Sequence, residues 1–551
     1  MSSAELRAKI IEVTLKNGGH LASSLGAVEI ALALRKVFDP EKDRILWDVG
    51  HQAYAWKLLT GREDRFDTLR QTDGIAPFPL PSESAADAAV AGHAGSALSV
   101  AVGMAAGGFK NVVAVVGDSS ISCGHSFEAM NNAAGARGKV IVVLNDNRMS
   151  ISGPVGALSK YFGRLLANRG YNRVKSAAED LGHKAGFTFL REIYHKIESR
   201  MKGLFVGSRF FEQFGFRYIG PVDGHDLKAL EDAFTVAKND KRSVVVHVAT
   251  VKGKGYEPAE KDPTKYHGVT GRGTRPACPD SPGWSEVFGA ALCELAREDP
   301  RLVAITAGMT EGTGLAGFAA EFPDRFYDVG IAEGHAVGFA AGLAAAGKRP
   351  VVAIYSTFLQ RAVDQIVHDV AIAKLPVIFA IDRAGVVGAD GITHHGLLDV
   401  AFLSAVPDLV IAEPKDAEDL KALLKEAVER GGSTAIRYPR GNRSNFDKVK
   451  AVAEALGCEC AHARYLKPLD TELLKRKKSE GKKIVFIGDF SSSAATSLFS
   501  TPFDRSFTWP DEFISHGGVA DLEKRYGLDV PSIISSLSSL TSQTSPILLY
   551  G

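Results

Sequence analysis

The chain is poor in cysteine, carries almost no net charge and lacks any long apolar run. Its 551 residues include five cysteines, and this small odd number argues against a disulfide-bonded scaffold. Because 65 Lys and Arg residues balance 64 Asp and Glu residues, the net charge of +1 gives no overall attraction to nucleic acid or to a membrane surface. Runs of 18 apolar residues and an apolar signal-peptide core are both missing. We therefore expect a cytoplasmic enzyme that binds neither nucleic acid nor a membrane.

Glycine is the residue type in excess, with 56 copies, and a chain of this length is expected to form several domains of roughly 100–200 residues each. A stretch dense in Gly and Pro, residues 268–284, is typical of a linker between domains. We predict a first domain at 1–277, a second at 278–445 and a smaller third at 446–551. The first two are both of the α/β class.

In the first block, apolar spacing predicts helices at 5–16 and 26–37. Short runs rich in β-branched residues predict buried strands at 111–116, 139–144 and 243–248, with a helix at 126–136 between the first two strands. Residues 155–215 show no clear periodicity, and we expect them to run over the surface.

The second block alternates predicted strands and helices, which favours a doubly wound parallel sheet. Its strands are predicted at 302–306, 350–354, 376–381, 409–412 and 434–437. In the third block, the clearest strand is 484–487, and the Ser-rich stretch 532–545 is expected to be poorly ordered.

Asp118 and Asn147 each follow a predicted buried strand of the first block. The carboxyl ends of parallel strands meet at one edge of the sheet, where ligands bind. A carboxylate and an amide carbonyl are oxygen ligands of the kind that Mg²⁺ prefers, and a helix that starts after Asp118 would favour a diphosphate at the same place. Taken singly, Asp118 is better explained as a helix cap and Asn147 as a turn residue. The pair predicts a site for Mg²⁺ and a diphosphate.

Gly117-Asp118 followed by Asn145-Asp146-Asn147 resembles the thiamine diphosphate motif. Longer strings, in the same order along the chain, resemble the 1-deoxy-D-xylulose-5-phosphate synthase family. They are Asp48–Tyr54, Asn145–Ser152, Gly255–Pro263, Ala353–Arg361, Ala380–Gly385, Gly388–Gly391 and Arg437–Asn442.

This resemblance implies a fold and a reaction. The fold would be two parallel-sheet domains of the thiamine diphosphate-binding type, followed by a smaller domain like the C-terminal domain of transketolase. The reaction would join pyruvate and D-glyceraldehyde 3-phosphate to give 1-deoxy-D-xylulose 5-phosphate and CO₂, a product that feeds isoprenoid, thiamine and pyridoxal synthesis. The cofactors would be thiamine diphosphate and Mg²⁺, and the protein would be a homodimer.

The resemblance also implies roles for individual residues. Mg²⁺ would be bound by Asp118, by Asn147 and by the backbone carbonyl of Met149. Glu333 would bind a ring nitrogen of the cofactor, Phe358 would stack on its pyrimidine, and Ile151 would hold it bent. The other cofactor contacts would be His51, His93, Ala94, Gly95, Ser119, Ser120, Asn147 and Tyr256.

Proton transfer is assigned by the same resemblance to His20, His267 and His394, since histidine titrates near neutral pH. Arg383 and Arg440 match ligands of the substrate phosphate, for which guanidinium groups are suited. Tyr355, Arg361 and Asp390 match groups that line the substrate pocket.

The chain departs from the family pattern at several positions. Ser119 stands where the family has a glycine, and a side chain there would crowd the diphosphate if its φ angle were positive. Gly334 replaces a glutamine and Arg148 an acidic residue. Between Asn442 and Lys467 the chain looks too short for the usual first strand and helix of the third domain. We expect Ser119 to weaken cofactor affinity, and we expect the departures together to affect catalytic efficiency more than the fold.

Two alternatives stay open beside the synthase. One is another thiamine-dependent carboligase, such as a transketolase that takes its two-carbon unit from a ketose phosphate. The other is a catalytically impaired paralogue, which Ser119 and the short third domain would favour. Pyruvate use with CO₂ release separates the synthase from both alternatives.

Overall fold

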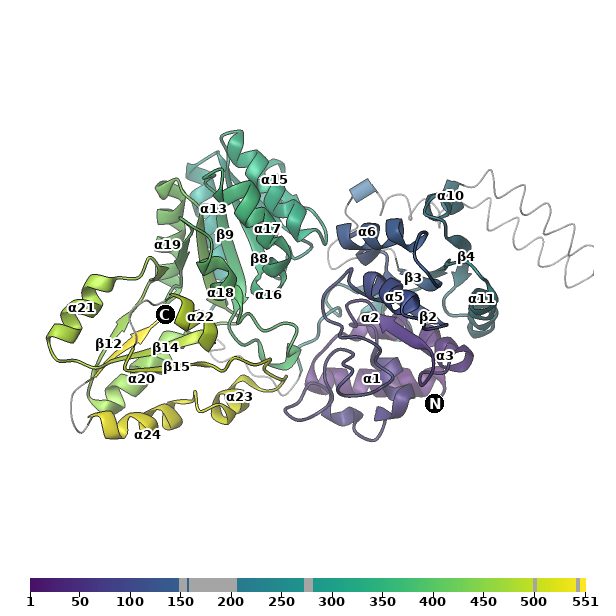
Figure 1. Ribbon diagram of the computed structural model, residues 1–551, viewed down its shortest axis with the longest axis horizontal. Coiled ribbons are helices and arrows are strands. Elements are labelled where there is room, and N and C mark those ends of the chain that lie inside the picture. Colours follow the sequence, from purple (N-terminus) through teal and green to yellow (C-terminus); the bar gives the residue numbers. More distant parts are fainter. Residues whose placement is uncertain (148–155, 158–205, 272–280, 499–502, 542–545) are drawn as a thin grey trace, which may run out of the picture. The chain divides into compact units, whose positions relative to one another are not determined.

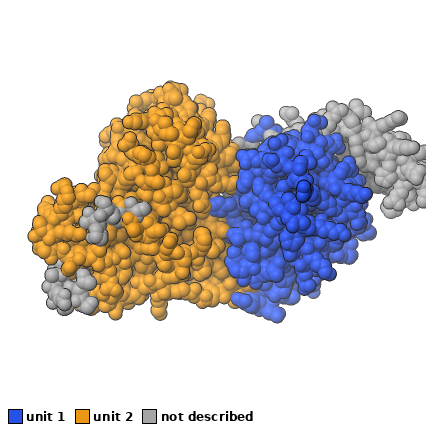
Figure 2. All heavy atoms as spheres, in the orientation of Figure 1, with its two compact units in different colours: residues 1–67, 78–270 blue, residues 68–77, 271–551 orange. Residues whose placement is uncertain are grey.

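The computed structural model describes residues 1–147, 156–157, 206–271, 281–498, 503–541 and 546–551 (Figure 1). The chain divides into two compact units (Figure 2). The first contains residues 1–67 and 78–270, and the second contains residues 68–77 and 271–551. Most of the predicted surface excursion at 155–215 lies outside the described residues. No helix within the described ranges is both long enough and apolar enough to cross a lipid bilayer.

The first unit is built on a five-stranded sheet in which every strand pair is parallel. Its order is β1-β2-β3-β5-β4, with β1 Arg44–Trp47, β2 Val112–Gly117, β3 Val140–Asp146, β4 Arg217–Asp223 and β5 Val244–Ala249. The three strands predicted in this unit are confirmed. Their apolar side chains are buried, as expected for parallel strands covered on both faces.

Helices pack around this sheet (Figure 1). They are α1 Ser3–Asn17, α2 Leu21–Gly26, α3 Val28–Val37, α4 Tyr54–Lys57, α5 Ala97–Ala106, α6 Gly124–Ala133, α10 Val206–Gln213, α11 Leu227–Asn239 and α12 Glu257–Lys261. The helices predicted at 5–16, 26–37 and 126–136 are confirmed with small shifts of their ends. α1 begins at a capping box, in which Ser2 and Glu5 bind each other's backbone N–H groups.

The second unit contains two sheets. The larger has the order β13-β10-β11-β9-β8-β6-β7 and is parallel except for β13. Its strands are β6 Leu302–Thr306, β7 Phe326–Asp328, β8 Arg349–Tyr355, β9 Ile378–Ala384, β10 Val410–Ala412, β11 Thr434–Pro439 and β13 Tyr465–Lys467. The smaller sheet is parallel, in the order β12-β16-β14-β15, with β12 Glu459–His462, β14 Ile484–Ser491, β15 Arg505–Trp509 and β16 Ile547–Tyr550. The predicted α/β class and all six strands predicted in this unit are confirmed.

The helices of the second unit alternate with these strands. They are α13 Trp284–Glu298, α14 Ala316–Glu321, α15 Glu333–Ala345, α16 Ser356–Leu359, α17 Val363–Gln365, α18 Asp399–Ser404, α19 Ala417–Arg430, α20 Asn445–Leu456, α21 Thr471–Ser479, α22 Ser492–Leu498, α23 Val519–Arg525 and α24 Val530–Thr541. The short 3₁₀ or π-helical turns among the described residues of both units are η1 Leu58–Arg62, η2 Phe66–Thr68, η3 Ser120–Ser122, η5 Pro323–Arg325, η6 Gln360–Ala362, η7 Ile366–Ala371 and η8 Gly388–Asp390.

The interval between Asn442 and Lys467 holds a helix, α20, followed by the strands β12 and β13, and no strand precedes α20 in this described interval. The expected loss is therefore wrong for the helix and is not contradicted for the first strand. The expectation of poor order in the Ser-rich stretch is wrong. Most of the Ser-rich stretch forms α24, because Ile533 and Leu537 lie four residues apart on one face and are buried in the core of the smaller sheet. β13 lies beyond residue 446 and yet pairs with β10, so the strands of the larger sheet cross the predicted boundary at 445. The division into three domains stays a prediction.

A buried arginine joins the two sheets of the second unit. Arg437, on β11, donates hydrogen bonds to the Asp399 carboxylate (3.0 Å), to the Asp489 backbone carbonyl (3.1 Å) and to Glu413. Glu413 also accepts a hydrogen bond from the Tyr550 hydroxyl of β16. Burial raises the pKa of Glu413, although Arg437 opposes this effect. The guanidinium therefore neutralises carboxylates that would otherwise be uncompensated in the interior.

We expect Arg437→Ala to lower the free energy of unfolding by about 3–5 kcal/mol, because it leaves Asp399 and Glu413 buried without their cation. Urea unfolding followed by tryptophan fluorescence and circular dichroism measures this loss. Arg297→Ala, which breaks an exposed pair with Glu321, is the matched control and should leave the midpoint unchanged. Equal midpoints for both variants would contradict the assigned role of Arg437.

Candidate active site

Asp118 lies at the carboxyl end of β2, beside the end of β3 as predicted. Its backbone N–H donates to the Asn145 carbonyl (3.2 Å), and its carboxylate accepts from the Ser119 N–H (3.0 Å). Burial, reinforced by the nearby Asp146 carboxylate, raises the pKa of Asp118 to about 7. A carboxylate buried next to a second one is an arrangement that a cation would stabilise.

Lys252 lies at the same edge of the sheet and was not predicted from the sequence as a site residue. Lys252 follows β5, is 5% exposed, and interacts electrostatically with Asp118. Burial lowers the pKa of this ammonium to about 8, although Asp118 opposes the shift. A cation at this edge suits a diphosphate. The only local signal for Lys252 in the sequence is its position shortly after a buried strand.

The position of Ser119 removes one objection raised by the sequence. Its φ and ψ angles are −75° and −36°, in the right-handed helical region, so a serine is accommodated without backbone strain. Glycine is instead required at Gly95, where φ is +79° and a Cβ atom would lie 2.9 Å from the Cβ of Cys123. Asp48 accepts hydrogen bonds from the N–H groups of Gly95 (2.8 Å) and Ala97 (3.0 Å). It thereby holds the segment that contains His93 and Ala94.

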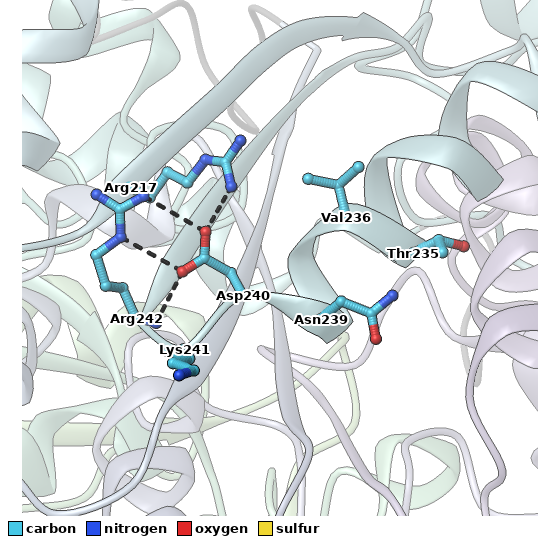
Figure 3. A pocket seen from close by; sticks show the side chains of 7 residues that line it. All are labelled: Arg217, Thr235, Val236, Asn239, Asp240, Lys241 and Arg242. Atoms are coloured by element: carbon cyan, nitrogen blue, oxygen red, sulfur yellow. Dashed lines mark hydrogen bonds and ion pairs between the residues drawn. The ribbon is translucent and has the colours of Figure 1, made fainter.

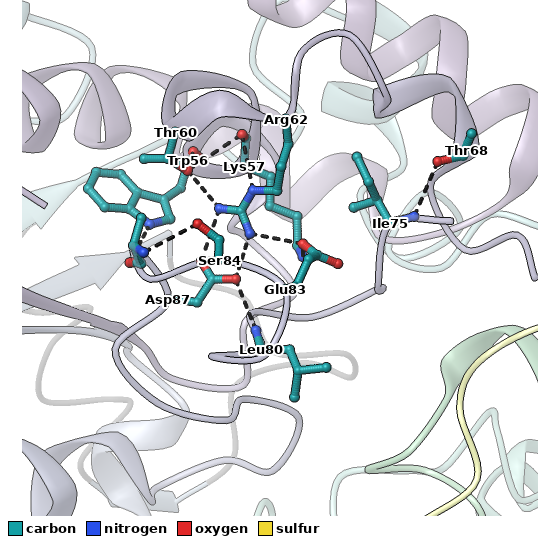
Figure 4. A network of polar contacts seen from close by, with 11 residues as sticks. Trp56, Lys57, Thr60, Arg62, Thr68, Ile75, Leu80, Glu83, Ser84 and Asp87 are labelled. Atoms are coloured by element: carbon teal, nitrogen blue, oxygen red, sulfur yellow. Dashed lines mark hydrogen bonds and ion pairs between the residues drawn. The ribbon is translucent and has the colours of Figure 1, made fainter. Parts of the chain in front are cut away.

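Four charged residues, all buried or half-buried, form a network of ion pairs within the stretch 57–87, which precedes this segment in the sequence (Figure 4). Arg62 donates to Asp87 (2.6 Å) and to Glu83 (2.9 Å), and Lys57 also binds Glu83 (2.5 Å). Asp87 accepts a further hydrogen bond from the Leu80 N–H (2.9 Å). The network ties the segment around 80–87 to α4 and η1.

Three predicted histidines gather in the first unit. The ring centroids of His20, His51 and His267 lie 5.5–6.0 Å apart. Burial and the charge of Lys252 lower the pKa of His51 to about 3 and hold the pKa of His267 well below its usual value. The His51 Nδ1 atom is buried and has no hydrogen-bond partner among the described residues. Both imidazoles are therefore held in their neutral form at neutral pH, in which one ring nitrogen is a hydrogen-bond acceptor.

The remaining predicted residues of the first unit are less closely defined. Ser120 is buried and its carbonyl accepts from Ser126 (2.8 Å), while Tyr256 packs edge-on against Tyr266. Asn147 directly follows β3. Met149 and Ile151, and with them Arg148, lie outside the described residues. No group of three His, Cys, Asp or Glu side chains in the described ranges is arranged to hold a metal, but the expected Mg²⁺ ligands include only one residue of these types, Asp118.

In the second unit Glu333 is the first residue of α15. It is 5% exposed, and its carboxylate lies 3.7 Å from the Arg361 guanidinium. Burial raises the pKa of Glu333, and Arg361 only partly offsets this effect. Glu333 is therefore held toward its protonated form. Beside it, a Cβ atom at Gly334 would lie 3.0 Å from the Gln365 amide oxygen, so Gln365 occupies the space that a side chain at 334 would need.

Four predicted residues form a continuous aromatic and cationic cluster. The Arg383 guanidinium carbon lies 3.7 Å from the centre of the Tyr355 ring. Tyr355 stacks on Phe358 with centroids 5.7 Å apart, and Phe358 meets the His394 ring edge-on at 5.5 Å. The four residues lie on β8, on α16, on β9 and in the segment after η8, so the fold brings together residues that are apart in the sequence.

Asp390 bridges two arginines in the same unit. It binds Arg440 (2.6 Å), which the resemblance assigns to the same pocket, and also Arg70 (2.5 Å), which was not predicted from the sequence. Burial would raise the pKa of Asp390, but Arg70 and Arg440 hold it well below its usual value. No local pattern could have identified Arg70, because its partner lies 320 positions further along the chain.

A hollow elsewhere on the first unit is not a candidate. It is lined by Arg217, Thr235, Val236, Asn239, Asp240, Lys241 and Arg242 (Figure 3). Asp240 binds both Arg217 (2.5 Å) and Arg242 (3.3 Å), so its carboxylate is already engaged, and none of the predicted site residues lines this hollow.

The comparisons with known proteins identify the family. Residues 1–250 match the family profile described as 1-deoxy-D-xylulose-5-phosphate synthase, and residues 280–444 match the transketolase pyrimidine-binding domain. A protein named 1-deoxy-D-xylulose-5-phosphate synthase 1 from Geobacter metallireducens is 44% identical over 96% of this chain and 94% of its own length. The chain belongs to the 1-deoxy-D-xylulose-5-phosphate synthase family.

Other curated relatives carry the same protein name. The 1-deoxy-D-xylulose-5-phosphate synthases of Oleidesulfovibrio alaskensis and Thiobacillus denitrificans are each 43% identical over 97% of this chain, covering 93% and 94% of their own lengths. Among solved structures, a transketolase from Campylobacter jejuni overlaps 98% of each chain at 15% identity, with a TM-score of 0.38. The family profiles and the curated relatives confirm the predicted family, and the chain is a thiamine diphosphate-dependent enzyme of the transketolase type.

The raised pKa of Asp118 makes a prediction for the metal-free enzyme of this family. Because its pKa is higher in the folded state than in the unfolded state, the free energy of unfolding falls as the pH rises from about 4 to about 7. Asp118→Asn should remove this dependence and raise the free energy of unfolding at pH 8 by up to about 4 kcal/mol, while weakening Mg²⁺-dependent cofactor binding.

Chemical unfolding at pH 5 and pH 8 in the presence of a chelator, together with calorimetric titration of thiamine diphosphate and Mg²⁺, checks both parts. Asp511→Asn, at an exposed position, is the control. Unchanged cofactor affinity in Asp118→Asn would exclude Asp118 as a ligand of the metal.

Proposed function

We propose that the chain converts pyruvate and D-glyceraldehyde 3-phosphate into 1-deoxy-D-xylulose 5-phosphate and CO₂. The observation that carries this proposal is the identity of 43–44% to synthases over 96–97% of the chain, combined with clustering of the predicted residues. The reaction balances without a further reactant, because two three-carbon substrates give a five-carbon product and CO₂. The product feeds isoprenoid, thiamine and pyridoxal synthesis in the family.

The residues of the first unit fit the diphosphate end of the cofactor with Mg²⁺. Asp118 and Asn147 supply oxygen ligands at the ends of adjacent strands, and the Met149 carbonyl is the third proposed ligand. Lys252 adds a buried positive charge, and Gly95 allows a tight backbone turn where a side chain would collide with Cys123. We assign His51, His93, Ala94, Ser119, Ser120 and Tyr256 to the same end, and Ile151 to the cofactor's central bend.

The residues of the second unit fit the aminopyrimidine end. Thiamine diphosphate supplies a carbon nucleophile that its own aminopyrimidine generates when a carboxylic acid binds the ring nitrogen. Glu333 is buried and held toward its protonated form, so it can donate a hydrogen bond to that nitrogen. Phe358 offers a ring for stacking on the pyrimidine.

Proton movement at the substrates is assigned to histidines. His20 and His267 lie within 5.5 Å of each other, ring centre to ring centre, and the neutral state of His267 leaves it able to accept a proton. His394 lies against Phe358, on the pyrimidine side. Arg383 and Arg440 are proposed to bind the acceptor phosphate, with Tyr355, Arg361 and Asp390 lining the pocket around it.

We also infer a homodimer. α5 and α15 carry apolar or small residues on nearly all sides, and helices of this composition are normally covered on all sides. In this single chain Val100, Gly103, Gly342 and Ala345 are exposed on them. A second copy of the chain would cover these faces.

Release of ¹⁴CO₂ from [1-¹⁴C]pyruvate, with thiamine diphosphate and Mg²⁺, tests the proposed function. The synthase requires release that glyceraldehyde 3-phosphate stimulates, with a pentulose phosphate as product. Two-carbon transfer from a ketose phosphate without CO₂ release would instead indicate a transketolase. Cofactor binding with neither activity would indicate an impaired paralogue.

Glu333→Ala should lower the rate of CO₂ release by at least about 100-fold, because the ring nitrogen loses its hydrogen-bond donor. Cofactor affinity, followed by quenching of tryptophan fluorescence, should change much less. Glu321→Ala, at an exposed site on α14, serves as the control. Near-normal turnover in Glu333→Ala would refute the assigned role.

Arg440→Ala should raise the KM for glyceraldehyde 3-phosphate by about 10-fold or more, because a charge-assisted contact to the phosphate is lost. The KM for pyruvate should change less. Steady-state kinetics with each substrate varied in turn gives both values. An equal rise for the two substrates would remove Arg440 from the phosphate site.

A further inference from the structure

We propose that the C-terminal part of the chain positions Arg70 in the substrate site, by holding the segment that carries it. We call residues 68–77 the strap and residues 515–518 the latch loop. The proposal rests on the proposed function, because it takes the pocket around Asp390 as the substrate site. Thr72, Gly517 and Arg525 are its positioning residues, and none of them touches Asp390.

The strap leaves the first unit after Asp67, is part of the second unit, and returns to the first at Phe78. It is closed at its neck, where the Ile75 N–H donates to the Thr68 hydroxyl (3.2 Å; Figure 4) and the Arg70 N–H donates to the Ile75 carbonyl (2.8 Å). Arg70 and Asp73 have φ angles of +68° and +59°, which are unfavourable for residues other than glycine. Such a conformation persists where surrounding contacts determine it.

Those contacts come from the latch loop and from α23. The Thr72 hydroxyl donates to the Asp521 carboxylate (3.0 Å) and accepts from the Gly518 N–H (3.2 Å). At Gly517 the two segments are in such close contact that a Cβ atom would lie 2.6 Å from the Thr72 hydroxyl oxygen. Arg525 binds Asp73 (2.5 Å), but this pair is exposed and contributes little by itself. The close packing of Thr72 against Gly517 is therefore the principal contact.

The latch loop also holds the segment that carries Asp390. His395 donates from Nε2 to the Ser515 carbonyl (3.1 Å), and its Nδ1 accepts from the Val387 N–H (3.1 Å). A Cβ atom at Gly391, where φ is +73°, would lie 2.7 Å from the Cβ of His516. One loop thus contacts both sides of the Arg70–Asp390 ion pair.

This arrangement has a chemical consequence. The Arg70 guanidinium lies 2.5 Å from Asp390, which also binds Arg440, so the placement of the strap sets the orientation of Asp390 and Arg440. Small displacements of such groups reduce transition-state stabilisation strongly. The latch should therefore act on substrate use and leave the cofactor site of the first unit unaffected.

The test is Gly517→Ala in the full-length protein. The added methyl group has no room beside Thr72 and should displace the strap. Hydrogen–deuterium exchange of peptides covering residues 68–77 should accelerate by about fivefold or more, a readout that does not depend on activity. The KM for glyceraldehyde 3-phosphate should rise by about fivefold, while the dissociation constant for thiamine diphosphate stays within about twofold. Gly432→Ala, where nothing lies within 4 Å of the added Cβ atom, is the matched control.

Thr72→Val, which keeps the shape of the side chain and removes its two hydrogen bonds, gives a milder variant if Gly517→Ala does not fold. Thr72→Ala in the Gly517→Ala background removes the clashing hydroxyl and should restore part of the substrate affinity. Unchanged exchange in the strap would overturn the latch. Faster exchange with an unchanged KM, or an equal loss of cofactor affinity, would overturn its role in positioning Arg70. Failure of the proposed function would show separately, as wild-type enzyme without aldehyde-stimulated CO₂ release.

Discussion

Charge buried at the carboxyl ends of parallel strands is the constraint on which the rest of this structure depends. Asp118 and Lys252 in the first unit, and Glu333, Asp390 and Arg437 in the second, are all at least nine-tenths buried in groups that balance charge only in part. Desolvation makes each of them costly unless a partner or a ligand compensates. The sites around Arg437 and Asp118 differ in how far their buried charges are compensated. Arg437 binds two carboxylates, one of which also accepts a hydrogen bond from a tyrosine hydroxyl, and one backbone carbonyl, whereas Asp118 lies beside another carboxylate and is left with a raised pKa. The first arrangement is stabilising and the second is prepared for a bound cation.

The same contrast separates the two ends of the proposed cofactor site. At the diphosphate end, the pKa of Asp118 is raised to about 7 and the pKa of Lys252 is lowered to about 8, so both groups gain from a ligand that brings Mg²⁺ and phosphate charges. At the pyrimidine end, Glu333 needs no metal. Its burial favours the protonated acid, which is the form that a ring nitrogen can bind. In the proposed function, one physical effect, desolvation, prepares one carboxyl group for a metal and another for a hydrogen bond.

The departures from the family pattern are milder in the structure than they look in the sequence. Ser119 has a helical backbone conformation, which removes the steric argument against cofactor binding, and Gln365 occupies the space beside Gly334. The C-terminal region keeps α20, β12 and a four-stranded parallel sheet. Its latch loop contacts the strap that carries Arg70, which gives this region a direct connection to the proposed substrate site.

The sequence by itself determined the α/β class, the positions of the core strands and most members of the proposed site. Continuous β-branched runs and their polar ends are local signals, and the resemblance to the family assigns roles to Glu333, Arg383 and Arg440 without any structure. Tertiary structure alone decided the rest. Arg70 reaches Asp390 across 320 positions, Lys252 acquires its lowered pKa only through burial, and α24 is stabilised by packing of Ile533 and Leu537 in a core formed by distant strands. In each case the deciding quantity is the environment of a side chain, and residues far away in the chain create that environment.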